Sequence, residues 1–136
     1  MKRSKAWVFT GKAKPKTKIL VYKKAEIKNH CQPLVDRLKQ QAIPANPDKQ
    51  FNYLADIYTK WHGNYLIFCA KYKSEFTDRI ADEFEEWFVR LEYTGTGRFN
   101  FSYFRHTGQW HLIAIDLTLN DCLEMIESNP AFQPIG

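Results

Sequence analysis

The sequence lacks an apolar run long enough to cross a membrane. Its longest such run, residues 65–70, is far shorter than the ~20 residues that a transmembrane helix needs. The chain starts with basic residues, but no apolar segment of signal-peptide length follows them. We therefore expect a cytoplasmic protein.

Cysteine is also scarce. The three cysteines, Cys31, Cys69 and Cys122, are far apart and form neither a metal-ligand pattern nor a disulfide framework. Each lies among apolar neighbours, as buried free thiols usually do. The sequence therefore predicts no metal site and no cofactor.

The motifs of common enzymes are missing as well. We find no nucleophile elbow, no Walker loop, no Cys–His pair and no carboxylate dyad. Gly95 and Gly97 precede a predicted strand, whereas a phosphate-binding loop leads into a helix. These two glycines therefore predict a hairpin turn, and the sequence argues against a hydrolase or an NTPase.

What the sequence has is the material for one folded domain. Its 136 residues are 44% hydrophobic and 26% charged, which is ordinary for a globular protein. A chain of this length can bury a core without metals or disulfides. The aromatic content of 15% is high and implies either an aromatic-rich core or an exposed aromatic surface.

Charge is distributed unevenly along the chain. Residues 1–28 carry ten Lys or Arg and one acid, whereas residues 29–136 carry ten Lys or Arg and fourteen acids. We expect residues 1–20 to form a basic, partly extended arm and residues 21–136 to form a single domain. Such an arm either contacts phosphates or another acidic partner, or serves as a solvated leader. Its candidate contact residues are Lys2, Arg3, Lys5, Lys12, Lys14, Lys16 and Lys18.

Hydrophobic periodicity predicts an α+β fold with helices packed on one face of an antiparallel meander of about five strands, in the order α-β-β-α-β-β-β-α. The apolar positions of residues 22–42 recur at helical spacing, although Pro33 either kinks this helix or opens a second one. Trp7-Val8-Phe9 could add a short strand in the arm. The other predicted elements are a hairpin at 52–60 and 64–72, a helix at 75–86, strands at 87–94, 98–105 and 110–116, and a helix at 119–128.

Alternation along two of these strands predicts which side chains share a face. In the first, Trp87, Val89, Leu91 and Tyr93 fall on one side. In the second, Phe99, Phe101 and Tyr103 oppose Asn100, Ser102 and Phe104. The aromatic set of the second strand faces the core in our interpretation. The alternative is an exposed platform that stacks on nucleic-acid bases, as RNA-recognition sheets do.

The last third of the chain resembles a known family. Residues 88–110 carry the pattern FxRLEYxGxGRFNxxYxRHTGQW, and L-x-x-C-L-x-x-I and N-P-x-F follow at 119–126 and 129–132. This combination is similar to a family of short conserved cyanobacterial proteins with no assigned function. His111 stands where many members carry a second Trp. The resemblance implies a cyanobacterial source and a cytoplasmic setting, but no chemistry.

Basic and aromatic residues gather at strand ends and turns of this region. The candidate contacts for an acidic partner are Arg98, Arg105, His106, Trp110 and His111. Histidines that flank one turn could share a metal or a phosphate, but no further ligand lies at a suitable spacing. The turn is therefore interpreted as structural, with an enzyme that uses His106 and His111 as the third hypothesis.

We thus expect a non-enzymatic binding module that contacts an acidic partner, foremost a nucleic-acid backbone, through the arm and this basic cluster. The alternative is a protein-interaction or assembly factor, in which two copies pair sheet edges or an arm docks onto the acidic stretch 75–92.

Overall fold

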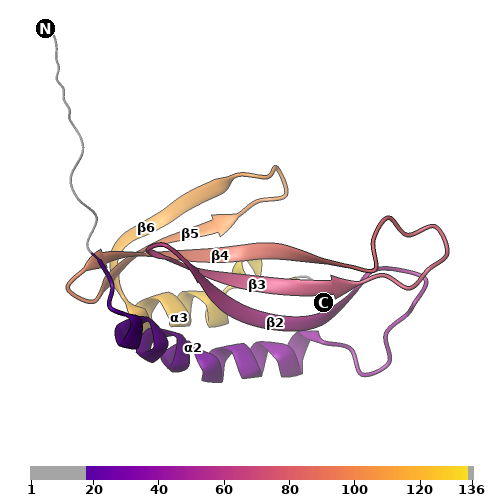
Figure 1. Cartoon of the computed structure of the whole chain (residues 1–136), viewed down its shortest axis with the longest axis horizontal. Helices are drawn as coiled ribbons and strands as arrows, with labels where there is room; N and C mark the ends of the chain where they lie inside the picture. Colours follow the sequence, from indigo (N-terminus) through magenta and orange to yellow (C-terminus); the bar gives the residue numbers. More distant parts are fainter. Residues whose placement is uncertain (1–17, 135–136) are drawn as a thin grey trace, which may run out of the picture.

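The computed structural model describes residues 18–134. The expected arm therefore lies almost wholly outside the described residues, and so does the Trp7-Val8-Phe9 segment. The described part forms two helices and five strands, with a short 3-10 turn at its end (Figure 1). These elements are α2 (Val21–Ala42), β2 (Tyr53–His62), β3 (Tyr65–Lys73), β4 (Glu83–Gly95), β5 (Arg98–Phe104), β6 (Trp110–Thr118), α3 (Leu119–Ser128) and η1 (Pro130–Phe132).

The sheet is an antiparallel meander in the order β2-β3-β4-β5-β6. Both helices lie below the sheet in Figure 1. We call the face that they cover the inner face and the opposite one the outer face. The fold is therefore the α+β class that the sequence predicts, with helices on one face.

The core lies between the inner face and the helices. The sheet contributes residues such as Phe68, Val89, Leu91, Phe99 and Phe101, and α2 contributes Ile27, Cys31, Leu34, Val35 and Leu38, all of which are buried. Burial of this apolar surface is the main force that holds the layers together.

Pro33 does not interrupt α2, and a side-chain cap begins α3. Pro33 lies inside α2, which runs unbroken as one helix, and the ring is on its exposed side. Thr118 caps α3 by accepting a hydrogen bond from the Asp121 amide at 3.1 Å, as threonine commonly does at a helix N-terminus. Arg37 and Glu127 join the two helices, with 2.6 Å between the Arg37 Nε and the Glu127 Oε2.

The predicted helix at 75–86 is wrong. Residues 74–82 form a loop, and β4 begins at Glu83. Ile80 is fully exposed, although its spacing of four residues from Phe76 and from Phe84 is typical of an apolar helical stripe. Phe84 instead stacks on Tyr72 of the neighbouring strand, with 5.4 Å between ring centroids, so strand pairing overrides the helical period.

The predicted position of Trp87 is also wrong. Phe68 pairs with Val89 and Cys69 pairs with Trp87, so Phe88 is an extra residue in β4. Such a bulge shifts the alternation of side chains along the strand. Val89 is consequently buried, whereas Trp87 points to the outer face and keeps 39% of its surface exposed.

Strands β4 and β5 differ in length, and this difference leaves an opening in the sheet. The pairing with β5 starts at Val89 and runs to Gly95, whereas β3 pairs with β4 from Glu83 onward. Figure 1 shows the β5–β6 hairpin rising away from the helices beyond this point. Within residues 18–134, the first half of β4 therefore pairs with a strand on one side only.

Candidate functional site

Aromatic rings and cations pack against one another on the outer face, where β4 lies beside the β5–β6 hairpin. The Arg90 guanidinium lies 4.4 Å from the ring centre of Tyr65 and 4.6 Å from that of Trp110. The Trp110 ring stacks on Trp87 with 6.2 Å between centroids and 12° between planes. The Lys60 ammonium lies 5.6 Å from the Trp87 ring. We call Tyr65, Arg90, Trp110, Trp87 and Lys60 the ladder.

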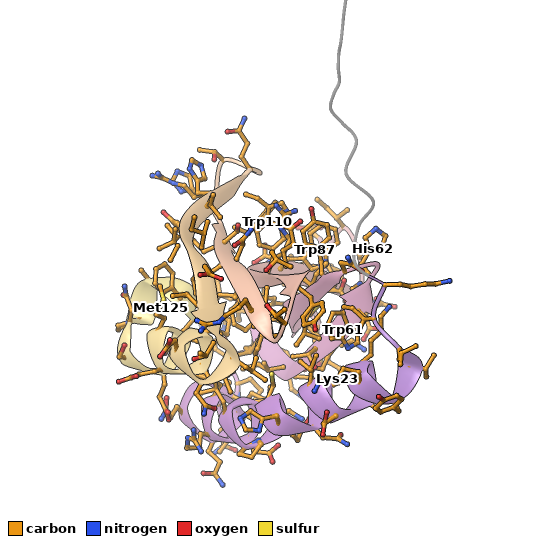
Figure 2. The ribbon with its side chains drawn as sticks, turned by 90° about the vertical axis from the view of Figure 1, so that its left-hand side faces the viewer. Lys23, Trp61, His62, Trp87, Trp110 and Met125 are labelled. Carbon is orange, nitrogen blue, oxygen red and sulfur yellow. The ribbon has the colours of Figure 1, made fainter. Side chains whose placement is uncertain are left out.

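The ladder joins strands that are not neighbours in the sheet. Trp110 begins β6, yet it reaches across β5 to Trp87 and Arg90 of β4. Phe104 of β5 packs edge-on beside this stacked pair, with 5.0 Å between its ring centroid and that of Trp110 and 6.1 Å to that of Trp87. Figure 2 shows Trp87 and Trp110 together on the side of the sheet away from the helices. The hairpin is thus fixed in its raised position by ring contacts on the outer face.

An acidic side chain lies beside the ladder. Glu85 accepts hydrogen bonds from the Lys60 Nζ at 2.6 Å, from the Trp87 Nε1 at 2.9 Å and from the Tyr58 hydroxyl. Burial by itself raises the pKa of the Glu85 carboxyl, but these three bonds outweigh it and hold the pKa at about 2. The carboxylate is therefore ionised at neutral pH, and it balances the charge of Lys60.

A cleft of about 830 Å³ opens next to the ladder, between the first half of β4 and the hairpin turn. A volume of this size is typical of ligand sites. Its lining combines apolar and aromatic side chains with a few charged ones, and includes Tyr72, Glu86, Trp87, Phe88, Tyr103, Phe104, Arg105, His106, Pro130 and Pro134.

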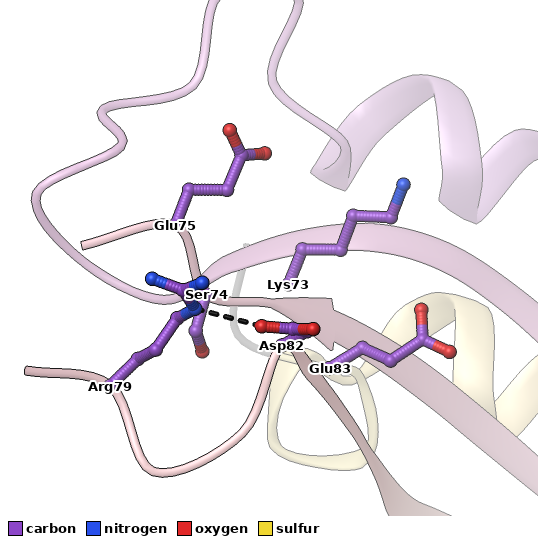
Figure 3. A pocket seen from close by; sticks show the side chains of 6 residues that line it. All are labelled: Lys73, Ser74, Glu75, Arg79, Asp82 and Glu83. Carbon is purple, nitrogen blue, oxygen red and sulfur yellow. Dashed lines mark hydrogen bonds and ion pairs between the residues drawn. The ribbon is translucent and has the colours of Figure 1, made fainter. Parts of the chain in front are cut away.

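A second cavity of about 470 Å³ lies in the 74–83 loop (Figure 3). Its Arg79 Nε donates to the Asp82 Oδ1 at 2.8 Å, and Ser74 donates to Asn52. Lys71 and Lys49 pair with Glu83 and Glu75. These side chains form hydrogen bonds and salt bridges with one another. We therefore interpret the cavity as part of a loop that its own side chains stabilise, and not as a binding site.

The structure brings together some of the predicted contact residues. Arg105 and His106 line the cleft, and Trp110 belongs to the ladder at its rim. Arg98 is separated from them by the length of β5, about 20 Å or more, and donates to the Asp116 carbonyl. His111 lies on the inner face, with 6.0 Å between its ring centroid and that of Tyr103.

No recorded contact within residues 18–134 joins His106 to His111, and no group of metal-ligating side chains occurs in this part of the chain. Of the arm residues, the structure describes Lys18, which is exposed; Lys2, Arg3, Lys5, Lys12, Lys14 and Lys16 lie outside the described range.

The rings of β5 do not form an exposed platform. Phe99 and Phe101 are buried at 2% and 0% exposure, and Tyr103 packs on Phe132. The interpretation that these rings face the core is confirmed for Phe99 and Phe101, and a base-stacking surface made of these rings is wrong.

The ladder was not predicted from the sequence, apart from Trp110. Tyr65, Arg90 and Lys60 belong to three different strands, and only the register of the sheet brings them together. A partial signal was present in residues 58–71, where Tyr58 and Lys60 flank the buried Thr59 and where Tyr65 and Lys71 stand at the two ends of the buried run 66–70. These positions indicate a face that is both aromatic and basic.

Residues 18–134 define a small α+β domain in which the described helices cover one sheet face and a cleft lies at the sheet margin. The chain belongs to the DUF3024 family, a domain of unknown function whose model matches residues 22–134. No curated protein and no solved structure matches the chain. Over residues 18–134, none of the helices has the length and apolarity to cross a membrane.

Proposed function

We propose that this chain is a non-enzymatic binding domain that contacts an acidic partner, and that the partner is nucleic acid. The observation that carries the proposal is the ladder, in which Trp87, Trp110, Arg90 and Lys60 share one helix-free face. Proteins that bind single strands combine aromatic stacking surfaces with cations along the backbone path. The outer face offers both kinds of group.

Each part of the site has a role in this proposal. Trp87, which is 39% exposed, offers a ring edge and part of a face to a base, and such stacking contributes ~1–3 kcal/mol per base. Arg105, exposed at the hairpin turn, and the lysines of the arm supply contacts to phosphates. Glu85 does not repel the backbone strongly, because Lys60 pairs with it at 2.6 Å.

The proposal is tested by the salt dependence of binding. A labelled single-stranded oligonucleotide is titrated with the full chain at about 50 and about 200 mM salt, where several phosphate contacts should change the affinity by orders of magnitude. Trp87→Ala should weaken binding at both salt concentrations, whereas Arg105→Ala should also reduce the salt slope. The matched control is Phe51→Ala, because Phe51 is a 64% exposed ring in the loop before β2. An absence of affinity at low salt would refute the proposal.

A second function, protein interaction or assembly, is favoured by the edge strand β6. Leu112, Ile113 and Ile115 are exposed at 62%, 43% and 62%, and no charged side chain lies between Trp110 and Ile115. Edge strands usually carry charges that prevent pairing with another chain. Light scattering tests a homodimer that forms here: a mass of two chains, returned to one chain by Leu112→Lys, would support it, and a monomer at every concentration would exclude it.

The setting of this function is part of the proposal. We place the domain in the cytoplasm, because its sequence has no long apolar segment and its three cysteines are free and buried. The pattern at 88–110 further suggests a cyanobacterial source.

A further inference from the structure

Although β4 is the central strand of the sheet, its first half has an unpaired edge on the side of β5. Residues 83–87 pair with β3 on one side and Phe88 is bulged, while the pairing with β5 begins only at Val89. Within residues 18–134, no backbone hydrogen bond outside the regular elements reaches 83–88. Their outward N–H and C=O groups therefore form a short template to which another strand can add.

The cleft of about 830 Å³ lies along this edge and suits the side chains of an added strand. Trp87 and Phe104, whose rings meet on the outer face, line one part of it. Phe88 and Tyr103, which pack toward the core, line another. A strand in this position would place alternate side chains on the two sides, each against an aromatic wall.

We propose that residues 6–10 of the same chain, Ala6-Trp7-Val8-Phe9-Thr10, occupy this cleft and add a strand to the free edge of β4. Four of these five residues are β-branched or aromatic, the types that fit a pleated and half-buried surface. They are also the one apolar run in residues 1–18. Trp7 and Phe9 share a face of such a strand, and Val8 takes the other.

The length of the arm permits this docking. The start of α2 lies beside the end of β2, since the Trp61 Nε1 donates to the Lys24 carbonyl at 3.0 Å, and Tyr65 just beyond pairs with Glu92 of β4. From Glu92 to the middle of the free edge the strand covers roughly 20 Å. The nine Cα–Cα steps from Phe9 to Lys18 span up to about 30 Å when extended.

Charge favours the same placement. Residues 1–17 carry six cations and no acid, three on the N-terminal side of Ala6 and three on the C-terminal side of Thr10. The free edge carries Glu83, Glu85 and Glu86, and Glu86 lines the cleft without a recorded salt bridge within residues 18–134. Opposite charges across the two segments would steer the arm toward this edge.

This inference goes beyond the proposed function, because it concerns where the arm lies when no partner is bound. A docked arm would bring its lysines and arginine next to Arg105 and the ladder, so that the cations of the arm, Arg105 and the ladder would lie on one surface. The arm and the basic turn would then act as a single site despite their separation in the sequence.

The test is hydrogen exchange of the β4 amides in the full chain, followed residue by residue by NMR. The outward amides of residues 83–88 should be protected in the wild type. Val8→Pro removes a backbone donor from the added strand, and it should speed their exchange by roughly tenfold or more. Ala13→Pro is the matched control, since it places the same residue in the arm outside residues 6–10 and should leave the protection intact.

Trp7→Ser provides a second variant that removes a side chain without altering the backbone, and it should also speed the exchange. Equal exchange in the wild type and in all three variants would overturn the proposal. Protection that grows with protein concentration would overturn the intramolecular placement. No nucleic acid is present in this measurement, so its failure would leave the proposed binding function untouched.

Discussion

At the scale of single residues, Arg90 shows how the outer face is held together. Its guanidinium is sandwiched between the rings of Tyr65 and Trp110, and its Nε is buried without a hydrogen-bond partner within residues 18–134. Contact with ring faces therefore replaces hydrogen bonds for part of this group. The arrangement depends on a flat cation, which is a property of arginine and not of lysine.

Arg90→Lys should accordingly lower the free energy of unfolding by about 1 kcal/mol, because the ammonium cannot stack on two rings at once. Urea denaturation measures this change. Arg105→Lys is the control, because Arg105 is exposed at a turn and should change stability by less than about 0.5 kcal/mol. Equal stability of the Arg90→Lys variant and the wild type would show that the sandwich contributes nothing to the fold.

Glu85 gives the fold a defined sensitivity to acid. Its pKa is about 2 in the folded state, against about 4.3 in an unfolded chain. A lowered pKa contributes stability that is complete above pH 4.3 and is lost as the pH falls toward 2. Between pH 5 and pH 2 the stability of Glu85→Gln should therefore fall less steeply than that of the wild type.

Urea denaturation at several pH values checks this expectation. Glu124→Gln serves as the control, because Glu124 is an exposed residue of α3 and no recorded salt bridge within residues 18–134 involves it. Parallel pH profiles for the wild type and Glu85→Gln would contradict the role given to the Glu85 hydrogen bonds.

At the scale of elements, the sequence predicts those parts whose signals are local. The helices α2 and α3 follow from their apolar periods, and the cap at Thr118 follows from its spacing to Asp121. The strand at 83–86 could not be predicted in this way, because Phe76, Ile80 and Phe84 imitate a helical stripe. Only pairing with β3, a contact distant in sequence, decides its conformation.

The same limit applies to the candidate site. Arg105, His106 and Trp110 were predicted because they are neighbours in sequence, and they do lie at the cleft or on its rim. Trp87 was placed on the wrong face because a bulge leaves no mark in the sequence. Arg90 had no sequence signal at all, since its partners come from β3 and β6.

Pro33 makes α2 less stable than the same helix would be with alanine at this position. It lies inside the helix on an exposed position, where it removes one backbone hydrogen bond and costs up to about 3 kcal/mol relative to alanine. Pro33→Ala should therefore raise the urea midpoint while leaving the slope of the transition unchanged. Pro47→Ala, in the loop before β2, is the control and should not stabilise the fold. An unchanged midpoint for Pro33→Ala would mean that the helix has already adapted to the ring.

At the scale of the whole molecule, the two faces of the sheet differ in what packs on them. The inner face is used for stability, because both helices and nearly all of the buried core lie there (Figure 1). Neither of the described helices covers the outer face, which carries the ladder and opens into the cleft. The residues that we propose to bind a partner can therefore change on the outer face without opening the buried core.

The paired indoles of this outer face give the molecule a built-in optical reporter. Trp87 and Trp110 lie with 6.2 Å between their centroids and 12° between their planes, which is close enough for their electronic transitions to couple. Where the in-plane transition moments are skewed to one another, this coupling gives a paired positive and negative band in the far-ultraviolet circular dichroism spectrum. The coupling fades steeply as the rings separate or rotate. The position of the hairpin against the rest of the sheet can thus be followed by light alone, with no label attached to the protein.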